Sequence, residues 1–211
     1  MDGQTYFEQV GHTKDFENPF PLERFESLLG KEAKIVEYGC GYGRILNQLG
    51  QQGYTHLIGY DYSSKMIQRG NAEYPELNLN YIPESGHIPL SDQTADLLIA
   101  STILCCLPEK EKQVALLAEF QRVLKKDGLL YLFDFLLCEH PSTHKKYEQG
   151  FKKHGEWGVY TTNEGLKVRH FTTPWVMDLM RPFNIQWFEQ FDFKTMNHNP
   201  ARTFQCLAVS S

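Results

Sequence analysis

Residues 37–43, Glu37-Tyr38-Gly39-Cys40-Gly41-Tyr42-Gly43, stand between a predicted strand and a predicted helix. Residues 33–38 are rich in apolar and β-branched side chains, as strands are. Residues 42–52 place apolar side chains at helical spacing and are followed by Gly53, a common helix stop. Because glycine adopts left-handed backbone angles without steric cost, three alternate glycines permit a tight turn and the close approach of a ligand. The stretch therefore predicts a strand-turn-helix unit with a ligand-binding loop.

The same alternation of strands and helices continues along the chain. Apolar runs predict further strands at residues 56–60, 79–82, 96–101 and 129–135, and helical spacing predicts helices at 63–71 and 108–125. Strands joined by helical crossovers form an open sheet with both faces covered. Residues 185–194 and 203–209 predict a closing antiparallel pair, and residues 157–171 predict a hairpin. The fold class is thus α/β, with a mostly parallel seven-stranded sheet, an antiparallel C-terminal strand pair and an inserted β-hairpin after strand 5.

An acidic residue, Asp61, ends the second predicted strand. An acid about 20 residues after the first glycine is placed to bind the hydroxyls of a ribose. A dinucleotide fingerprint would put its third glycine at position 44, where this chain has Arg44. Glu37 beside a pyrophosphate would be repelled. These observations favour a nucleoside ligand without phosphate over NAD, and a tight turn that binds no ligand is the other alternative.

The composition excludes several classes of protein. A chain of 211 residues with 41% hydrophobic and 22% charged residues is globular and favours one domain. A net charge of -5 disfavours binding to nucleic acid or an anionic membrane by bulk attraction. No apolar stretch approaches the roughly 18 residues of a membrane span, and the N-terminus lacks the pattern of a signal peptide. Five cysteines without a CxxC pair fit a reducing compartment, and no ligand spacing predicts a metal site. We expect a cytoplasmic protein.

Four blocks of the sequence resemble, in order, the motifs of a known family. They are VEYGCGYG at 36–43, IGYDYSSKMI at 58–67, ESGHIPLSDQTADLLIAS at 84–101 and FQRVLKKDGLLYLFD at 120–134. Over roughly residues 33–137 the chain resembles a class I S-adenosylmethionine-dependent methyltransferase, and it is most similar to the ubiquinone/menaquinone-biosynthesis type (type 11) of methyltransferase domain. The resemblance implies a Rossmann-like, doubly wound fold with S-adenosyl-L-methionine as the cofactor.

The resemblance also implies a set of cofactor-binding residues. Glu37 would order the glycine loop, which would lie against the methionine part of the cofactor, and Asp61 would bind the ribose. The family usually has an acid and a small residue flanking the adenine, and this chain has Glu84 and Ser85 there, with glutamate in place of the commoner aspartate. The implied residues are Glu37, Gly39, Cys40, Gly41 and Gly43 in the loop, Asp61, Tyr62, Met66, Glu84 and Ser85 around the nucleoside, and Ser101 and Thr102 facing the sulfonium and its methyl group.

The methyl acceptor is less constrained by the sequence. Methyl transfer from a sulfonium is an in-line displacement, so the protein must align the nucleophile, and a base is needed only when that nucleophile must lose a proton. Ser101-Thr102-Ile103-Leu104 lacks the N/D-P-P-Y/F motif of enzymes that methylate amino groups of nucleobases or protein glutamine. Cys105 and Cys106 are interpreted as packing residues. A small-molecule acceptor is favoured, and the alternatives are a protein or RNA methyltransferase and a non-catalytic cofactor-binding partner subunit.

Three candidates, one of them a group of residues on the inserted hairpin, belong to the acceptor side of the site. Tyr6 is a candidate lid residue over the cofactor, with plain packing as the alternative. Trp157, together with Tyr160 and His170, is a candidate for an aromatic pocket on the inserted hairpin. His140 follows the fifth strand, and its reference pKa of about 6.5 suits a general base. A solvated loop histidine is the interpretation that we favour for His140.

The expected organisation is a single domain over residues 1–211. It comprises an N-terminal lid and helix (1–30), a cofactor-binding core (33–137), an insertion (138–175) and a closing helix with strands (176–211). Lysines are concentrated in residues 144–154; a solvated helix face is the usual meaning of such a run, and contact with an anionic substrate is the alternative. We expect a monomer or homodimer with no membrane partner and no nucleic-acid partner.

Overall fold

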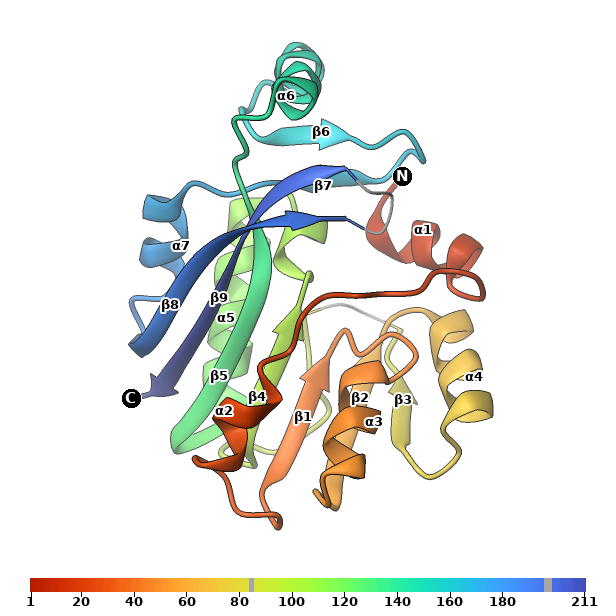
Figure 1. The fold of residues 1–211 in the computed structure, drawn as a ribbon, viewed down its shortest axis with the longest axis vertical. Coiled ribbons are helices and arrows are strands. Elements are labelled where there is room, and N and C mark those ends of the chain that lie inside the picture. The colour runs from red at the N-terminus through yellow and green to blue at the C-terminus, as the bar shows by residue number, and fades with distance from the viewer. Residues whose placement is uncertain (84–85, 196–198) are drawn as a thin grey trace.

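A seven-stranded sheet forms the centre of the computed structural model, which describes residues 1–83, 86–195 and 199–211 (Figure 1). The strand order is β3-β2-β1-β4-β5-β9-β8. The first five strands in this order are parallel, and β9 and β8 are antiparallel additions at one edge. The bounds are β1 Lys34–Tyr38, β2 His56–Asp61, β3 Asn78–Tyr81, β4 Ala95–Ser101, β5 Leu124–Leu136, β8 Phe183–Lys194 and β9 Pro200–Ser210. The predicted fold class is confirmed.

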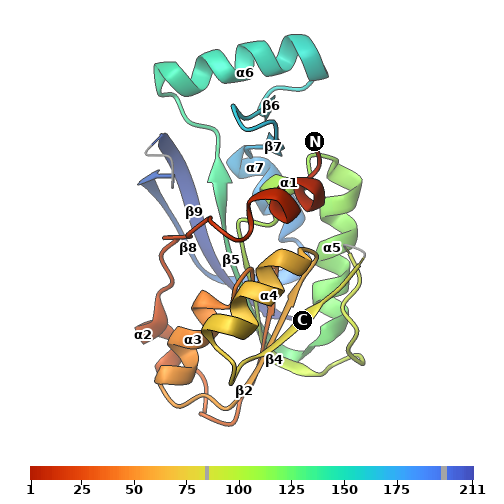
Figure 2. The ribbon, with the colours of Figure 1, turned by 90° about the vertical axis from the view of Figure 1, so that its right-hand side faces the viewer.

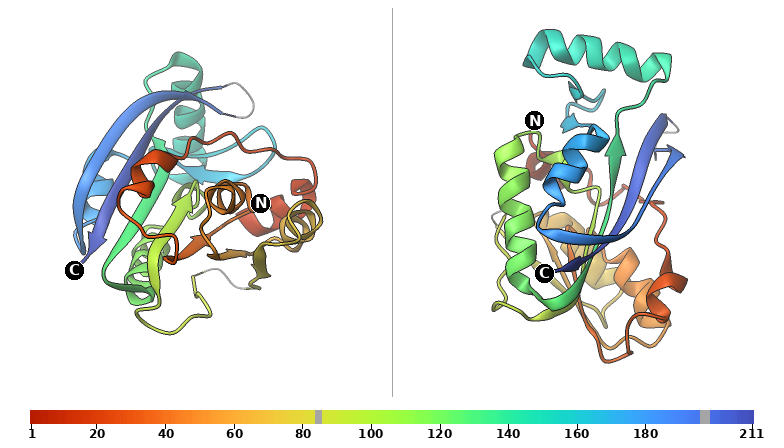
Figure 3. Two further views of the ribbon diagram at one scale, coloured as in Figure 1. Left: turned by 60° about the horizontal axis from the view of Figure 1, so that its bottom comes forward. Right: turned by 90° about the vertical axis from the view of Figure 1, so that its left-hand side faces the viewer.

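Helices cover both faces of this sheet, as the apolar runs of its central strands require. Alternate residues of β4 enter different cores: Leu98 packs with α5 (Lys110–Val123) and α7 (Thr173–Leu179), whereas Leu97 packs with α3 (Arg44–Gln51). The short helix α2 (Leu22–Glu26) and helix α4 (Ser64–Glu73) lie with α3. Figure 3 shows α5 and α3 on opposite sides of the sheet. The period of two along each strand therefore sorts its side chains between two cores.

A cap of three segments stands at the carboxyl end of the parallel strands (Figures 1 and 2). Helix α1 (Gly3–Val10) comes from the N-terminus, and α6 (Pro141–His154) with the hairpin β6 (Val159–Thr161) and β7 (Lys167–Arg169) comes from the insertion after β5. A separate core joins them, with Tyr6, Tyr147 and Tyr160 buried together. In open α/β sheets this end of the strands is where ligands bind.

Two local features differ from the sequence expectations. The helix predicted at 108–125 ends at Val123, and β5 begins at Leu124 rather than at residue 129. The register against β4 shifts between Leu124 and Leu129, and Asp127, which lies in this interval, has a φ of 61°. Such a bulge interrupts the regular strand pattern, so the sequence placed the start of β5 at residue 129. No helix in the described parts of the chain has the length and apolar character needed to cross a membrane.

Candidate functional site

The glycine loop has the backbone conformation that its composition predicts. Gly39, Gly41 and Gly43 have φ angles of 72°, 56° and 87°. The amides of Gly39 and Cys40 both donate to the carbonyl oxygen of Tyr60, at 2.7 and 3.1 Å, which ties the loop to β2. A Cβ on Gly39 would lie 1.9 Å from Ile103 Cδ1, so a side chain here would displace Ile103 and strain the backbone. A Cβ on Gly43 would instead meet leucines near β3, which gives Gly43 a packing role.

Asp61, at the end of β2, anchors the glycine loop through hydrogen bonds. Its carboxylate accepts a hydrogen bond from the amide of Gly41 at 2.8 Å and another from Ser63 at 2.7 Å. The side chain is buried, and burial raises the pKa of Asp61 to about 6 against the opposing effect of these hydrogen bonds. These two hydrogen bonds from backbone amides fix the orientation of the carboxylate at the edge of the loop.

Glu37 on β1 is the second buried acid of the site. Burial, assisted by the charge of Asp61 and opposed by that of Arg44, raises the pKa of Glu37 to about 8. Its Oε2 is the one buried side-chain oxygen or nitrogen within the described residues that has no hydrogen-bond partner. A buried acceptor without a donor is costly. Two buried acids beside a loop of glycines, one of them with an oxygen that lacks a donor, suit a ligand that brings donors and positive charge.

A cavity of about 60 Å³ separates this loop from the N-terminal segment. It brings together most of the residues implied by the resemblance, which are Glu37, Gly39, Cys40, Gly41, Asp61, Tyr62, Met66, Ser101 and Thr102. Gly43 does not line the cavity, and Glu84 and Ser85 lie outside the described residues. The wall opposite the loop contains Phe7, Phe16 and Asn18, for which the sequence gives no motif.

The N-terminal segment is fastened across the mouth of the cavity by polar contacts. Asn18 Nδ2 donates to Ser101 Oγ at 3.4 Å and to Thr102 Oγ1 at 3.2 Å, and Arg44 donates to the Asn18 carbonyl at 2.7 Å. Phe16 stacks on Tyr42 with ring centroids 6.1 Å apart. These contacts make the segment a strap over the glycine loop, which we call the N-terminal strap (residues 11–20).

Thr102, directly after β4, has an unusual backbone. Its φ is 57°, which a β-branched residue rarely adopts. Its amide donates to the carbonyl oxygen of Phe133 at 2.7 Å, and this bond holds the strained residue in place. Backbone strain that the surroundings enforce is concentrated at functional sites. Thr102 lines two cavities, the one over the glycine loop and a larger neighbour.

The neighbouring cavity has a volume of about 500 Å³ and lies under the cap. We call it the acceptor cavity. Phe7, Phe16, Asn18 and Thr102 line both cavities, so the two adjoin. The remaining walls come from α1, the segment after β4 that contains Cys105 and Cys106, β5, α6, the hairpin, and described residues near the end of β8 and the start of β9. Its volume is within the range of about 300–1,000 Å³ that is usual for small-molecule sites.

His170 forms part of one wall of the acceptor cavity. Its ring stacks on Phe135 with centroids 5.1 Å apart, and its two nitrogens contact the hydroxyls of Tyr147 at 2.7 Å and Tyr160 at 3.1 Å. Burial, with a smaller effect of Lys146, lowers the pKa of His170 to about 3. The imidazole is therefore neutral at physiological pH, and its engagement with two tyrosines makes it a wall rather than a base.

The three acceptor-side candidates are placed differently. Tyr6 lines the acceptor cavity, donates to Glu164 and is buried in the core of the cap. Trp157 is 41% exposed, packs against His144 and Tyr147, and lines neither cavity.

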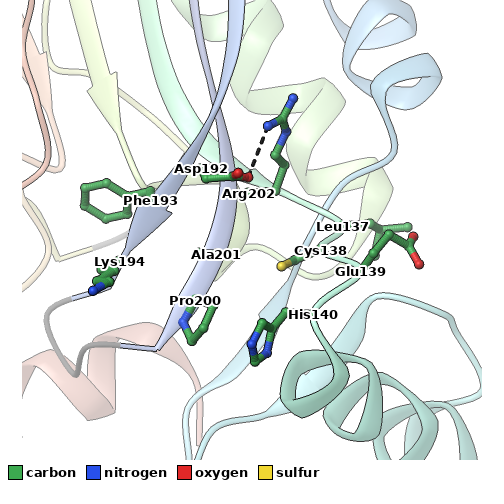
Figure 4. Close-up of a pocket in the computed structure, with 10 residues that line it drawn as sticks. All are labelled: Leu137, Cys138, Glu139, His140, Asp192, Phe193, Lys194, Pro200, Ala201 and Arg202. Atoms are coloured by element: carbon green, nitrogen blue, oxygen red, sulfur yellow. Dashed lines mark hydrogen bonds and ion pairs between the residues drawn. The ribbon is translucent and has the colours of Figure 1, made fainter.

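His140 lies in a different surface groove of about 740 Å³, beside Cys138 and Pro200 (Figure 4). Its imidazole accepts a hydrogen bond from the Ser142 amide at 3.4 Å and so caps α6. The groove also contains the ion pair of Asp192 and Arg202, at 3.1 Å. This groove shares Phe193 and Pro200 with the acceptor cavity, but His140 itself lines neither the loop cavity nor the acceptor cavity.

The adjacent cysteines contribute to packing. Cys105 is buried, its amide donates to Asp134 at 3.1 Å, and its Sγ lies 3.9 Å from that of Cys106. The hydrogen bond with Cys106 and burial raise the pKa of the Cys105 thiol well above its usual value, which disfavours the reactive thiolate. Among the described residues, no group of three or more His, Cys, Asp or Glu side chains is arranged to hold a metal ion.

The sequence of the part of the chain that contains the glycine loop is similar to known proteins. Residues 36–132 match a family described as "Methyltransferase domain". A ubiquinone/menaquinone biosynthesis C-methyltransferase UbiE from Campylobacter jejuni is 32% identical over 123 residues, which cover 54% of this chain and 49% of that protein. An uncharacterized protein from Haemophilus influenzae is 29% identical over 115 residues, which cover 51% of this chain and 44% of that protein. The chain thus spans about half the length of the curated relatives it matches.

Solved structures share the fold over nearly the whole chain. A SAM-dependent methyltransferase from Methanosarcina mazei superposes with a TM-score of 0.83 at 22% identity, covering 92% of this chain and 98% of that one. A SAM-dependent methyltransferase from Anabaena variabilis has a TM-score of 0.67 at 17% identity, and the superposition covers 99% of this chain and 93% of that one. At these identities the likeness shows the fold alone.

The sheet order and the glycine loop match the fold of class I S-adenosylmethionine-dependent methyltransferases, and residues 36–132 match a methyltransferase domain. S-adenosylmethionine is the cofactor of that class. The family match covers 97 of the 211 residues, and the UbiE relative is similar over 123 residues, so each comparison describes about half of the chain.

Proposed function

We propose that this protein transfers the methyl group of S-adenosylmethionine to a small molecule bound in the acceptor cavity. The observation that supports this is the contact between two cavities: one lies over the glycine loop, the other has the volume of a small-molecule site, and Thr102 lines both. We also propose that the chain is a single domain that acts in the cytoplasm, in which the cap supplies the acceptor specificity.

The residues at the loop fit the cofactor chemically. The glycines permit close approach of a ligand to the main chain, Asp61 offers a carboxylate oriented by two amides, and Glu37 offers an unsatisfied buried oxygen. The bound cofactor would supply a methyl group on a cationic sulfur, from which a nucleophile displaces a neutral thioether. Buried acids stabilise such a cation, and this stabilisation favours binding.

Binding requires the N-terminal strap to move. The cavity over the loop holds about 60 Å³, well below the roughly 300 Å³ at which small-molecule sites begin. Phe16 Cε2 lies 3.5 Å from the position of a Cβ on Gly41, so this ring covers the loop. The contacts that hold the strap across the site are exposed or half-exposed, and segments held by such contacts open at a low cost in free energy. We propose that it opens to admit the cofactor and closes to exclude water.

The size of the acceptor cavity favours a small molecule over a protein side chain or RNA. The cavity also lacks a strong base among its described residues, because His170 is neutral and bonded to two tyrosines. This favours a nucleophile that is already ionised or that loses its proton readily.

Calorimetry with S-adenosylmethionine tests the cofactor assignment. The wild type should bind in the micromolar range, and Asp61→Asn should bind at least about tenfold more weakly because the carboxylate charge is lost. Asp192→Asn, which removes an exposed carboxylate from the separate groove, is the matched control and should bind as the wild type does. Absence of binding, or equal affinity of Asp61→Asn, contradicts the assignment.

Transfer of labelled methyl groups to panels of small molecules, proteins and RNA tests the activity. Transfer to small molecules alone supports the proposal. Transfer to protein or RNA, or tight cofactor binding without transfer to any acceptor, supports one of the alternatives instead.

A further inference from the structure

The acceptor cavity contains a lysine whose charge is not balanced. Lys146 on α6 is half-buried, lines the cavity and forms no ion pair with any described residue. Its Nζ has one weak polar contact, 3.4 Å from Asn199 Oδ1. Figures 1 and 2 place α6 at the outer end of the cap, away from the glycine loop. A half-buried ammonium with a single neutral partner is an anion-binding group.

The other charged groups at the cavity compensate one another. Glu164 is the one carboxylate among the described lining residues, and it is paired with Lys14 at 2.5 Å and accepts a hydrogen bond from Tyr6. His170 is neutral because burial lowers its pKa to about 3. Lys146 therefore leaves this cavity positive within a protein whose net charge is -5. The local charge favours an anionic ligand.

The rest of the lining favours a flat, apolar ligand body. Phe7, Phe16, Phe135 and Tyr160 contribute aromatic rings, and Phe135 stacks on His170 with an interplanar angle of 13°. Aromatic walls bind planar rings by offset stacking and edge contacts. The described lining residues include a single lysine and no arginine, which matches a monoanion better than a phosphate dianion.

We infer that the methyl acceptor is a planar aromatic carboxylate and that Lys146 binds its carboxylate group. The inference rests on the proposed methyl transfer, since it names the substrate class of that site. The carboxylate is held at α6, and the nucleophilic part of the same molecule extends toward Thr102 and the glycine loop. Lys146 is thus a specificity-determining residue.

Binding of two probes of equal shape tests this assignment. 2-Naphthoate and 2-naphthamide share a bicyclic ring and differ in the charge of one substituent. Their dissociation constants are measured by calorimetry on the full chain, with and without saturating S-adenosylhomocysteine. The wild type should bind the naphthoate about tenfold or more tightly than the amide.

Variants on one helix isolate the role of Lys146. Lys146→Met should bring the affinities for the two probes within about twofold of each other, whereas Lys146→Arg should keep the preference for the naphthoate. Lys145→Met removes an identical charge from the neighbouring, exposed position and should leave the preference intact. Methionine and lysine have similar helix propensities, so α6 should persist, which far-UV circular dichroism checks.

Three results overturn the inference: no binding of either probe to the wild type, equal binding of both, or equal loss of preference in Lys146→Met and Lys145→Met. Affinity for S-adenosylhomocysteine is recorded for the same samples. If the wild type does not bind S-adenosylhomocysteine, the proposed function is contradicted. If it binds S-adenosylhomocysteine but shows no preference between the two probes, only the acceptor class is contradicted.

Discussion

The pH dependence of stability provides a direct test of the buried acid Glu37. In the folded chain the pKa of this carboxyl is raised to about 8 from its usual 4.5, mainly by burial. Between these two values the folded state retains a proton that the unfolded state has lost. Unfolding therefore releases a proton, and stability falls as pH rises, by about 1.4 kcal/mol per pH unit.

Glu37→Gln removes this titration while keeping the shape of the side chain. From pH 6 to pH 8 the wild type should lose about 2 kcal/mol of stability relative to the variant, since the slope flattens as the folded pKa is approached. That amount is large beside a total stability of about 5–15 kcal/mol. The window avoids most of the titration of Asp61, whose pKa is raised to about 6.

Urea unfolding followed by tryptophan fluorescence at pH 6, 7 and 8 measures the effect. Glu189→Gln, at an exposed position on β8, is the control and should differ from the wild type by a constant amount. If the stabilities of wild type and Glu37→Gln stay parallel across this range within about 0.5 kcal/mol, Glu37 is not a protonated buried acid and the reasoning fails.

Three further outcomes follow from the site. Affinity for S-adenosylmethionine should rise from pH 6 to pH 8, because a cationic ligand favours the ionised forms of Glu37 and Asp61. Binding should then release protons, which calorimetry detects as a binding enthalpy that depends on the buffer. An affinity independent of pH would contradict this. Gly39→Ala should lower stability by about 1–3 kcal/mol and weaken cofactor binding, since a Cβ would meet Ile103 at 1.9 Å and φ is 72°; unchanged thermal midpoint and affinity would count against the loop geometry. His140→Ala should leave methyl transfer within about twofold of wild type and cost up to about 1 kcal/mol through loss of a helix cap, whereas a large fall in rate with intact folding would restore it as a base.

Local sequence determined the framework of this protein. Periods of two and of 3.6 are properties of neighbouring residues, so the strands and helices of the sheet could be predicted before the fold was known. Gly39 and Asp61 could be identified because their roles depend on backbone angles and on the end of one strand. The start of β5 was predicted wrongly for the same local reason, since the irregular residues before Leu129 interrupt the strand pattern.

Tertiary structure alone decided the acceptor side. Phe16 and Asn18 belong to no motif, and they reach the site because the N-terminal strap folds back over residues more than twenty positions away. His140 and Lys146 lie six positions apart in one helix and its cap, yet they face different cavities. Which one faces the acceptor depends on how α6 packs against the hairpin and the β8–β9 pair, and such long-range packing leaves no periodic pattern in the sequence. The cofactor loop was thus determined by its own residues, whereas the acceptor cavity was determined by the contacts between segments.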